Sequence, residues 1–280
     1  MNKEITKHRF FRAAFVVAFC VALGNDHSFA QVVQLGSITH PGIRESSGLQ
    51  ASRRYPGIFW THNDSGKPPF LFAIREDGAY VRGFQLFGAN PIDWEDLGMD
   101  NAGNLYIADT GIDGLRRTHV AIHRVPEPNP FRIKGARVNK TWLLRFPDIR
   151  HDVEAFFVWN NFGYLVTKVR TNDVVGIYRY PLSSRARSIL LQKVTDIDVT
   201  AQVTAADITP DGQKLALLTE EGPYSFLING DVSQAPFAPR TFTQLINTFM
   251  EGATFTSRGL LVSAETRQML LFTGDAYRWP

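Results

Sequence analysis

Acidic side chains recur along this chain at regular distances from glycine turns, and carboxylates in such numbers suit the binding of a hard cation. Glu95, Glu154 and Glu251 lie eight or nine residues before a turn glycine, and each is followed 14 residues later by a second charged residue. Unrelated loops rarely share such spacing, so we interpret these acids as equivalent positions of a repeat. Carboxylate oxygens are the ligands that Ca²⁺ and Mg²⁺ prefer.

The candidate metal ligands are the acids expected at the ends of two neighbouring strands in the repeats. They are Glu45, Asp64, Glu95, Asp109, Glu154 and Glu251. Ca²⁺ is the expected cofactor and Mg²⁺ the alternative. Crowded, partly desolvated carboxylates have raised pKa values unless a cation compensates for them. The alternative interpretation is that these acids accept hydrogen bonds from turn N–H groups and hold the fold together without a ligand.

Three further residues could take part in a reaction at such a site. His62 and His151 each lie beside acids in the sequence, so either could act as a general base or as a metal ligand. Lys168 stands where other repeats carry an acid, and it would either neutralise a neighbouring glutamate or hold an anionic ligand. The sequence has no G-x-S-x-G, H-E-x-x-H or Walker motif, so the chemistries of those motifs are not indicated.

The elements that position these residues are short strands. Runs of Val, Ile, Leu, Phe and Tyr, such as 57–60, 164–168 and 260–264, are separated by Gly, Pro, Asn and Asp. Short strands with regular turn signals are typical of a barrel, sandwich or propeller. Successive units start 47 to 59 residues apart, which is the repeat length of a propeller blade with four strands. We therefore predict an all-β fold, a single β-propeller.

The two ends of the chain predict how the ring closes. The last unit, residues 251–280, is too short for four strands, and residues 32–38 have no partner at the other end. We expect residues 32–38 to form the outer strand of the last blade. This gives five blades; six is the alternative, if residues 131–146 form strands of their own. The best helical candidate is 241–250. Because the first strand of each blade lines the central channel, the repeated acids should gather at its mouth.

Residues 1–30 have the pattern of a signal peptide. A basic start precedes an apolar run at 13–24, and small residues favour cleavage between Ala30 and Gln31. The apolar run of 12 residues is shorter than the roughly 18 needed to span a membrane. We predict a periplasmic or secreted protein with its propeller domain over 31–280. The only cysteine, Cys20, lies within the signal, so the exported part would need no disulfide.

Charge argues against one class of partner. The chain carries 30 Lys and Arg against 27 Asp and Glu, and the predicted signal contains four of the basic and two of the acidic residues. The remainder is close to neutral and has no basic run, so binding of nucleic acid is not expected. We expect a monomer without membrane contact after cleavage, with a small-molecule or anionic ligand as the candidate partner.

Four motifs in the first half of the chain resemble those of a known family. ESSGL (45–49), WTHNDSG (60–66), DWEDL (93–97) and LYIADTG (105–111) are similar to motifs of secreted bacterial β-propellers, loosely akin to SdiA-regulated propeller proteins and to esterase-like phytase propellers. The resemblance fades after about residue 154. It implies a propeller fold, export and binding of a divalent cation. The family pattern D-x-G-D-N is interrupted here by Ile112.

Two functions fit these patterns. The first is an exported binding module whose acidic channel holds Ca²⁺ and a small ligand. The second is a metal-assisted hydrolase of the phosphoesterase or esterase/lactonase type. In that enzyme the acids would hold the metal, His62 or His151 would move protons, and Lys168 would bind the anion. The fold alone does not choose between them, because propellers host both binders and enzymes.

Overall fold

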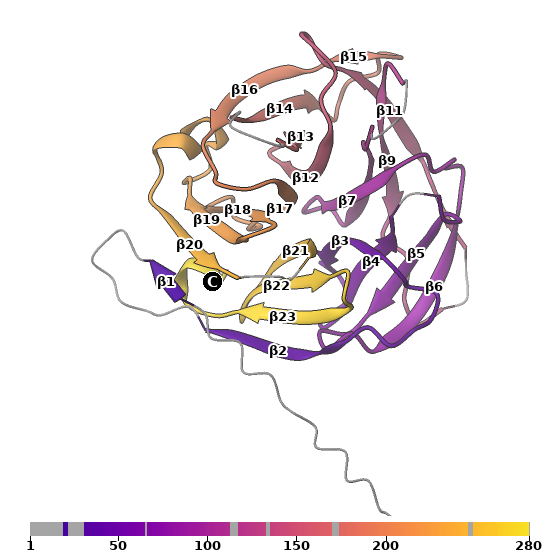
Figure 1. Cartoon of the computed structure of the whole chain (residues 1–280). Helices are drawn as coiled ribbons and strands as arrows, with labels where there is room; N and C mark the ends of the chain where they lie inside the picture. Colours follow the sequence, from indigo (N-terminus) through magenta and orange to yellow (C-terminus); the bar gives the residue numbers. More distant parts are fainter. Residues whose placement is uncertain are drawn as a thin grey trace, which may run out of the picture.

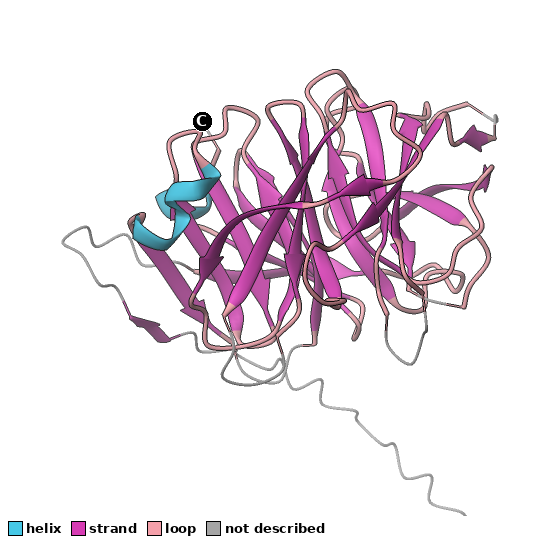
Figure 2. Ribbon diagram, turned by 90° about the horizontal axis from the view of Figure 1, so that it is seen from above, coloured by secondary structure: helices cyan, strands magenta, loops and turns pink. Residues whose placement is uncertain are grey.

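Five β-sheets stand around a common axis, and each forms one blade of a propeller (Figure 1). The computed structural model describes residues 19–21 and 31–279, apart from 65, 113–116, 133–134, 170–173 and 246–248. In this part of the chain the helical segments are two short 3₁₀ turns, η1 (Val232–Phe237) and η2 (Asp275–Tyr277), and no helix could cross a bilayer. In the side view the strands run between the two faces of the ring, and loops lie at both faces (Figure 2). The predicted five-bladed, all-β propeller is confirmed.

The first four blades use strands in chain order, with the innermost strand first. Blade one contains β3 (Ser46–Ala51), β4 (Phe59–Asn63), β5 (Phe70–Ile74) and β6 (Tyr80–Phe87). Blade two contains β7 (Trp94–Met99), β8 (Asn104–Asp109), β9 (Val120–Pro126) and β11 (Lys140–Arg145). Blade three contains β12 (Val153–Trp159), β13 (Phe162–Thr167), β14 (Val175–Pro181) and β16 (Gln192–Ile197). Blade four contains β17 (Val203–Ile208), β18 (Lys214–Thr219), β19 (Gly222–Leu227) and β20 (Arg240–Gln244).

Blade five joins the two ends of the chain. It contains β21 (Met250–Thr256), β22 (Gly259–Ala264), β23 (Gln268–Phe272) and, as its outer strand, β2 (Val32–Ser37). β2 pairs antiparallel with β23, from Val32 opposite Phe272 to Ser37 opposite Gln268. In Figure 1 the indigo β2 lies beside the yellow β23. The predicted closure of the ring by the N-terminal strand is confirmed.

Short edge strands complete three of the sheets. β10 (Ala136–Arg137) pairs with β6, β15 (Ile189–Leu190) pairs with β11, and β1 (Phe19–Val21) pairs with β20. The described part of residues 131–146 thus supplies β10 to blade one and β11 to blade two, and it forms no sixth blade. The expected helical turn at 241–250 is wrong in its first half, because residues 241–244 belong to β20 and pair along β19. Apart from β1, the predicted signal peptide lies outside the described residues.

The core is packed between neighbouring blades. The innermost strands β3, β7 and β17 are buried along their whole length, because they face the axis on one side and the next blade on the other. Aromatic side chains fill the wedges farther out: the Trp142 ring lies 6.0 Å from Tyr106 and 5.7 Å from Tyr180. Burying each such side chain contributes about 1.5–3 kcal/mol. This packing fixes the inner strands, whose ends carry the acids.

A buried carboxylate on blade two ties three blades together. Asp96 is fully buried, and its Oδ2 accepts hydrogen bonds from the backbone N–H groups of Phe156 (2.8 Å) and Ala206 (3.1 Å). Its Oδ1 accepts from the N–H of Leu97. Burial raises the pKa of Asp96 well above its usual value, and the three backbone donors act in the opposite direction. One side chain therefore fixes the inner strands of blades two, three and four relative to one another.

A second buried carboxylate continues this tie to blade five. Asp207 Oδ2 accepts hydrogen bonds from Thr254 Oγ1 (2.9 Å) and from the N–H of Phe255 (2.8 Å). Burial raises the pKa of Asp207, while the nearby Arg53 guanidinium of blade one lowers it. Gln50, also on blade one, donates to Thr254 Oγ1 at 3.3 Å. Polar contacts around the axis thus link all five innermost strands.

Candidate functional site

Every innermost strand has a register irregularity near the start of its pairing, after one residue pair in blades two to five and after two pairs in blade one. The register skips one residue in each blade: Gly48, Glu95, Glu154, Thr204 and Glu251. A bulge leaves its extra residue unpaired and changes the direction of the side chain. Three of the predicted glutamates are therefore bulge residues turned out of the strand ladder. In blade one the bulge falls at Gly48 and not at Glu45, so the expected alignment of Glu45 with the other glutamates differs from the structure.

Acidic side chains from four blades line one cavity of about 220 Å³ at this end of the axis. We call this cavity the acid mouth. Its lining consists of Glu45, Ser46, Ser47, Asp64, Asp93, Glu95, Glu154, Lys168, Glu251 and Glu265. The acid mouth contains five of the six predicted metal ligands and one of the three predicted catalytic residues. Asp93, Glu265, Ser46 and Ser47 also line the cavity and are not among the residues predicted from the sequence, although Glu265 is the charged residue 14 positions after Glu251.

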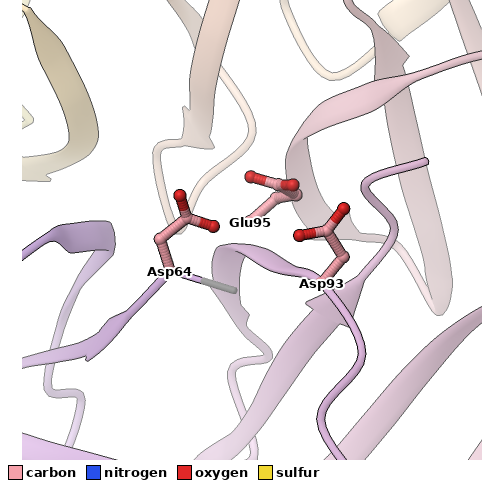
Figure 3. A group of neighbouring side chains, drawn as sticks. All are labelled: Asp64, Asp93 and Glu95. Atoms are coloured by element: carbon pink, nitrogen blue, oxygen red, sulfur yellow. The ribbon is translucent and has the colours of Figure 1, made fainter. Parts of the chain in front are cut away.

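Three carboxylates of the acid mouth are close enough to share one ion. Asp64, Asp93 and Glu95 each offer an oxygen within 4.8 Å of the others, and they point toward one another (Figure 3). Asp93 and Glu95 are 7% exposed. A Ca²⁺ ion holds its oxygens at about 2.3–2.6 Å, so ligands on opposite sides of it are about 5 Å apart. The spread of the three oxygens therefore fits one Ca²⁺.

Gly111 makes room for these carboxylates. It follows β8, and its N–H lies 3.3 Å from the backbone oxygen of Asp93. A Cβ atom at this position would overlap Glu95 Oε1 and Asp93 Oδ2. Any other residue would push the two side chains apart. The glycine of the DTG sequence is thus a requirement of the acid mouth and not only of a turn.

Burial and mutual repulsion raise the pKa values of these acids. Desolvation is the main cause at Asp93, whose pKa rises to about 6, and at Glu251, whose pKa rises to about 8. The pKa of Glu95 is also raised, first by burial and then by the charges of Glu154 and Asp64. Groups that resist ionisation in this way are stabilised as carboxylates by a bound cation. The electrostatics of the acid mouth therefore favour a positively charged occupant.

Lys168 supplies one positive charge within the acid mouth. Its Nζ lies 2.9 Å from Glu154 Oε1, and the two side chains are 20% and 12% exposed. Burial lowers the pKa of Lys168, but the attraction of Glu154 outweighs it, so the pKa is raised. Burial likewise raises the pKa of Glu154, against the effect of Lys168. The predicted neutralisation of a neighbouring glutamate by Lys168 matches this contact.

Asp109 is not part of the acid mouth. Its carboxylate pairs with Arg117 at 2.6 Å and lies 3.7 Å from His123 Nε2. Burial opposes ionisation, but the nearby His123 and the hydrogen-bonded Arg117 guanidinium lower the pKa of Asp109 overall. The same carboxylate accepts the N–H groups of Ile92 and Asp93. Asp109 thus positions the backbone that carries Asp93 and does not face the cavity.

The two predicted catalytic histidines lie outside the lining of the acid mouth. His62 is fully buried on β4, edge-on to the Trp94 ring at 5.5 Å, and burial lowers its pKa. His151 lies 3.1 Å from Asp148 and 3.2 Å from the hydroxyl of Tyr178. Both of these contacts of His151 are with residues of blade three or of the loop that precedes it. Neither histidine is therefore placed to take a proton from a molecule in the cavity.

Comparison with known proteins adds little beyond the architecture. No protein-family model matches the chain, and no curated protein matches it. A solved structure of virginiamycin B lyase from Staphylococcus aureus aligns at 13% identity and a TM-score of 0.45, over 82% of this chain and 66% of that one. Hydrazine synthase from Kuenenia stuttgartiensis aligns at 10% identity and a TM-score of 0.41, over 81% and 58%. This chain spans less than two thirds of either.

The strand pairing and the acid mouth together define the class of this protein. It is a five-bladed β-propeller, closed by its N-terminal strand, with carboxylates gathered at one end of the axis. The membership of the secreted family expected from the four motifs has no support from the comparisons, so it stays a prediction.

Proposed function

We propose that this chain is an exported β-propeller binding module that holds a divalent cation, Ca²⁺ before Mg²⁺, in the acid mouth. The observation that carries the proposal is the group formed by Asp64, Asp93 and Glu95, whose oxygens lie within 4.8 Å of one another. Ca²⁺ takes six to eight oxygens in a flexible arrangement. The oxygens of the three carboxylates together with bound water would supply that number.

The hydrolase alternative receives less support. A metal-assisted hydrolase needs a base within reach of the metal-bound water. His62 and His151 do not line the acid mouth, and Lys168 is paired with Glu154. The remaining candidates for a base are carboxylates that a bound metal would itself engage. The binding module needs no such base, and we favour it for that reason.

Calorimetric titration of the full chain with Ca²⁺ tests the proposal. We expect saturable binding of one ion and a rise in the thermal midpoint of unfolding, because a ligand that binds only the folded state stabilises it by about 2.7 kcal/mol at a hundredfold excess over its Kd. The double variant D93N/E95Q should bind at least about tenfold more weakly. Mg²⁺ should bind more weakly than Ca²⁺.

Glu220→Gln is the matched control. Glu220 is exposed, follows the second strand of blade four as Glu265 does in blade five, and does not line the acid mouth. Its variant should bind Ca²⁺ as the natural chain does. Absence of heat and of any thermal shift with either ion would show that the carboxylates of the acid mouth are structural.

A further inference from the structure

A second cavity lies at the end of the axis opposite to the acid mouth, where the inner strands finish. Its volume is about 310 Å³, which is within the range of ligand pockets. The turns after the inner strands of four blades contribute to its lining, with Arg53 from blade one, Asn101 from blade two, Asn160 from blade three and Thr209 from blade four. We call it the Arg53 cavity.

Arg53 brings an unpaired guanidinium to the wall of this cavity. Its Nε and Nη1 are buried and have no hydrogen-bond partner among the residues that the structure describes. The Trp279 ring centre lies 5.1 Å from the guanidinium carbon, a cation–π contact that holds the group in place. Nη2 is therefore the nitrogen left for a molecule in the cavity. Because a buried polar group without a partner is costly, an acceptor at Nη2 would stabilise this arrangement.

Two nearby acids attract the charge of Arg53 without pairing with it. Burial lowers the pKa of Arg53, and the attraction of Asp207 and Glu127 acts in the opposite direction. The Asp207 carboxylate accepts its hydrogen bonds from the inner strands of blades four and five. Glu127 Oε1 accepts from Trp60 Nε1 at 2.8 Å. Since these acids serve other donors, the guanidinium keeps hydrogen-bonding capacity of its own.

The charges around Arg53 favour a ligand with a single negative charge. Asp100 lines the cavity, and Asp207 and Glu127 are close enough to act on Arg53. A phosphate monoester carries about two negative charges at neutral pH, and these acids would repel it strongly. A carboxylate carries one charge, and its oxygens match the planar N–H donors of a guanidinium. We therefore expect a carboxylate at Arg53.

The rest of the lining suits a hydroxylated ring. The side chains of Asn101, Asn160 and Asn161 each carry an amide that offers donors and an acceptor. Trp159 adds a half-buried indole, which the hydrogen bond from its Nε1 to the backbone oxygen of Gly230 (3.0 Å) holds in place. Amides can bond the hydroxyls of a sugar, while an aromatic ring packs against its C–H groups.

We propose that the Arg53 cavity binds a sugar acid, a hydroxylated ring with one carboxylate, and that Arg53 Nη2 donates to the carboxylate. Asn160 and Asn161 bond the hydroxyls, and Trp159 packs against the ring. This site goes beyond the cation binding proposed for the acid mouth. The two cavities lie at opposite ends of the axis and have no lining residue in common.

Calorimetric titration of the full chain with glucuronate and with galacturonate tests the proposal. Glucose is the matched control ligand, because it has the ring and hydroxyls of glucuronate but no carboxylate. We expect saturable binding of at least one of the two sugar acids. Glucose should bind at least about tenfold more weakly than glucuronate or galacturonate, whichever binds, because it cannot form the charge-assisted hydrogen bond to Arg53.

Two variants test the residues. R53M removes the guanidinium and should weaken binding of the sugar acid at least about tenfold. Arg44→Met is the matched control, since Arg44 is exposed and does not line the cavity. If R53M does not fold, as judged by circular dichroism, N160G/N161G replaces it. Both asparagines have a positive φ, 46° and 63°, which glycine adopts readily, so the turn should persist while binding weakens.

The outcomes separate this inference from the proposed function. Binding of a sugar acid that R53M weakens and Arg44→Met does not supports the inference. No saturable heat with either sugar acid overturns it, and so does equal affinity for glucose or for R53M. R53M should bind Ca²⁺ as the natural chain does, because Arg53 does not line the acid mouth. Failure at the Arg53 cavity therefore leaves the cation proposal standing.

Discussion

Glu95 shows how burial decides the chemistry of a single residue here. Its side chain is only 7% exposed. Burial and the neighbouring acids raise its pKa. Such a group either keeps its proton or shares a cation. Protons would therefore compete with the proposed metal ion for the acid mouth, and pH should control which of them is bound.

The stability of the metal-free protein should fall as pH rises from about 5 to 8. The pKa of Asp93 is raised to about 6 and that of Glu251 to about 8, mainly by burial. In this window the folded state holds protons that the unfolded state has released, so stability decreases with increasing pH. Thermal unfolding in the presence of a chelator, measured across this range, checks the sign.

Saturating Ca²⁺ should reverse that trend, because the ion binds the ionised carboxylates and its affinity rises with pH. The variant D93N/E251Q without metal should show a flatter dependence than the natural chain. A metal-free protein that grows more stable between pH 5 and 8 would contradict the raised pKa values of these acids.

Gly111→Ala should weaken Ca²⁺ binding by at least about tenfold while leaving the fold intact. The added Cβ overlaps the oxygens of Glu95 and Asp93 that face the ion, and misplaced ligands cost affinity. Calorimetric titration measures the loss, and circular dichroism checks the fold. Equal affinity in the alanine variant would show that these two carboxylates do not act together on the ion.

At the scale of single elements, the sequence predicts the strands better than the direction of their side chains. The spacing from Glu95 and Glu251 to the turn glycines locates β7 and β21, and the glutamates do face the axis. The bulge that turns them inward cannot be recognised from the alternation of apolar and polar residues. The inner strands are buried on both faces, so they show no such alternation that a bulge could interrupt. The alignment of Glu45 with the other glutamates is therefore wrong, because the bulge of blade one falls at Gly48. Asp109, at the end of β8, is held outside the acid mouth by its ion pair with Arg117, which the spacing does not predict.

The role of Asp96 does not follow from its sequence neighbours. The structure divides the acids of DWEDL: Asp93 and Glu95 face the cavity, and Asp96 faces the inner strands of other blades. Only the three-dimensional position of the N–H groups of Phe156 and Ala206 shows this role. A single sequence contains no signal for it.

Asp96→Ala should destabilise the protein by at least about 3 kcal/mol. The change leaves three buried backbone N–H groups without the carboxylate that accepts from them, and each such loss costs about 1–3 kcal/mol. Urea unfolding gives the free energy. Glu220→Ala, at an exposed position, should change it by less than about 0.5 kcal/mol. A similar small loss for Asp96→Ala would mean that other contacts hold the three blades.

At the scale of the whole molecule, ring closure was predictable because it is a matter of counting strands. A last unit of 30 residues lacks one strand, and 32–38 is a strand without a partner. The pairing of β2 with β23 follows. Five blades rather than six follow from the edge strand β10 and the outer strand β11, which use residues 136–145. What a site inside the ring binds does not follow from such counting.

Two truncated chains should show that the closing strand β2 contributes to thermal stability and that the predicted signal peptide does not. A chain that begins at Gln31 loses β1 but keeps four strands in blade four, so its thermal midpoint should stay within about 3 °C of the full chain. A chain that begins at His40 loses β2 and should unfold at least about 10 °C lower. Calorimetry measures both. The predicted cleavage is tested by expressing the full chain in bacteria and by mass spectrometry of the periplasmic fraction, where we expect Gln31 as the first residue.

The carboxylates that join the inner strands also determine from which face of the ring a ligand could reach the acid mouth. Asp96 reaches from blade two to blades three and four across the axis. The acid mouth and the cavity around Arg53 at the other end have no lining residue in common. The side chains of Gln50, Asp96 and Thr254 are fully buried at the axis, so they close the two cavities off from each other. A ligand of the acid mouth would therefore enter and leave through one opening, on the face where that cavity lies.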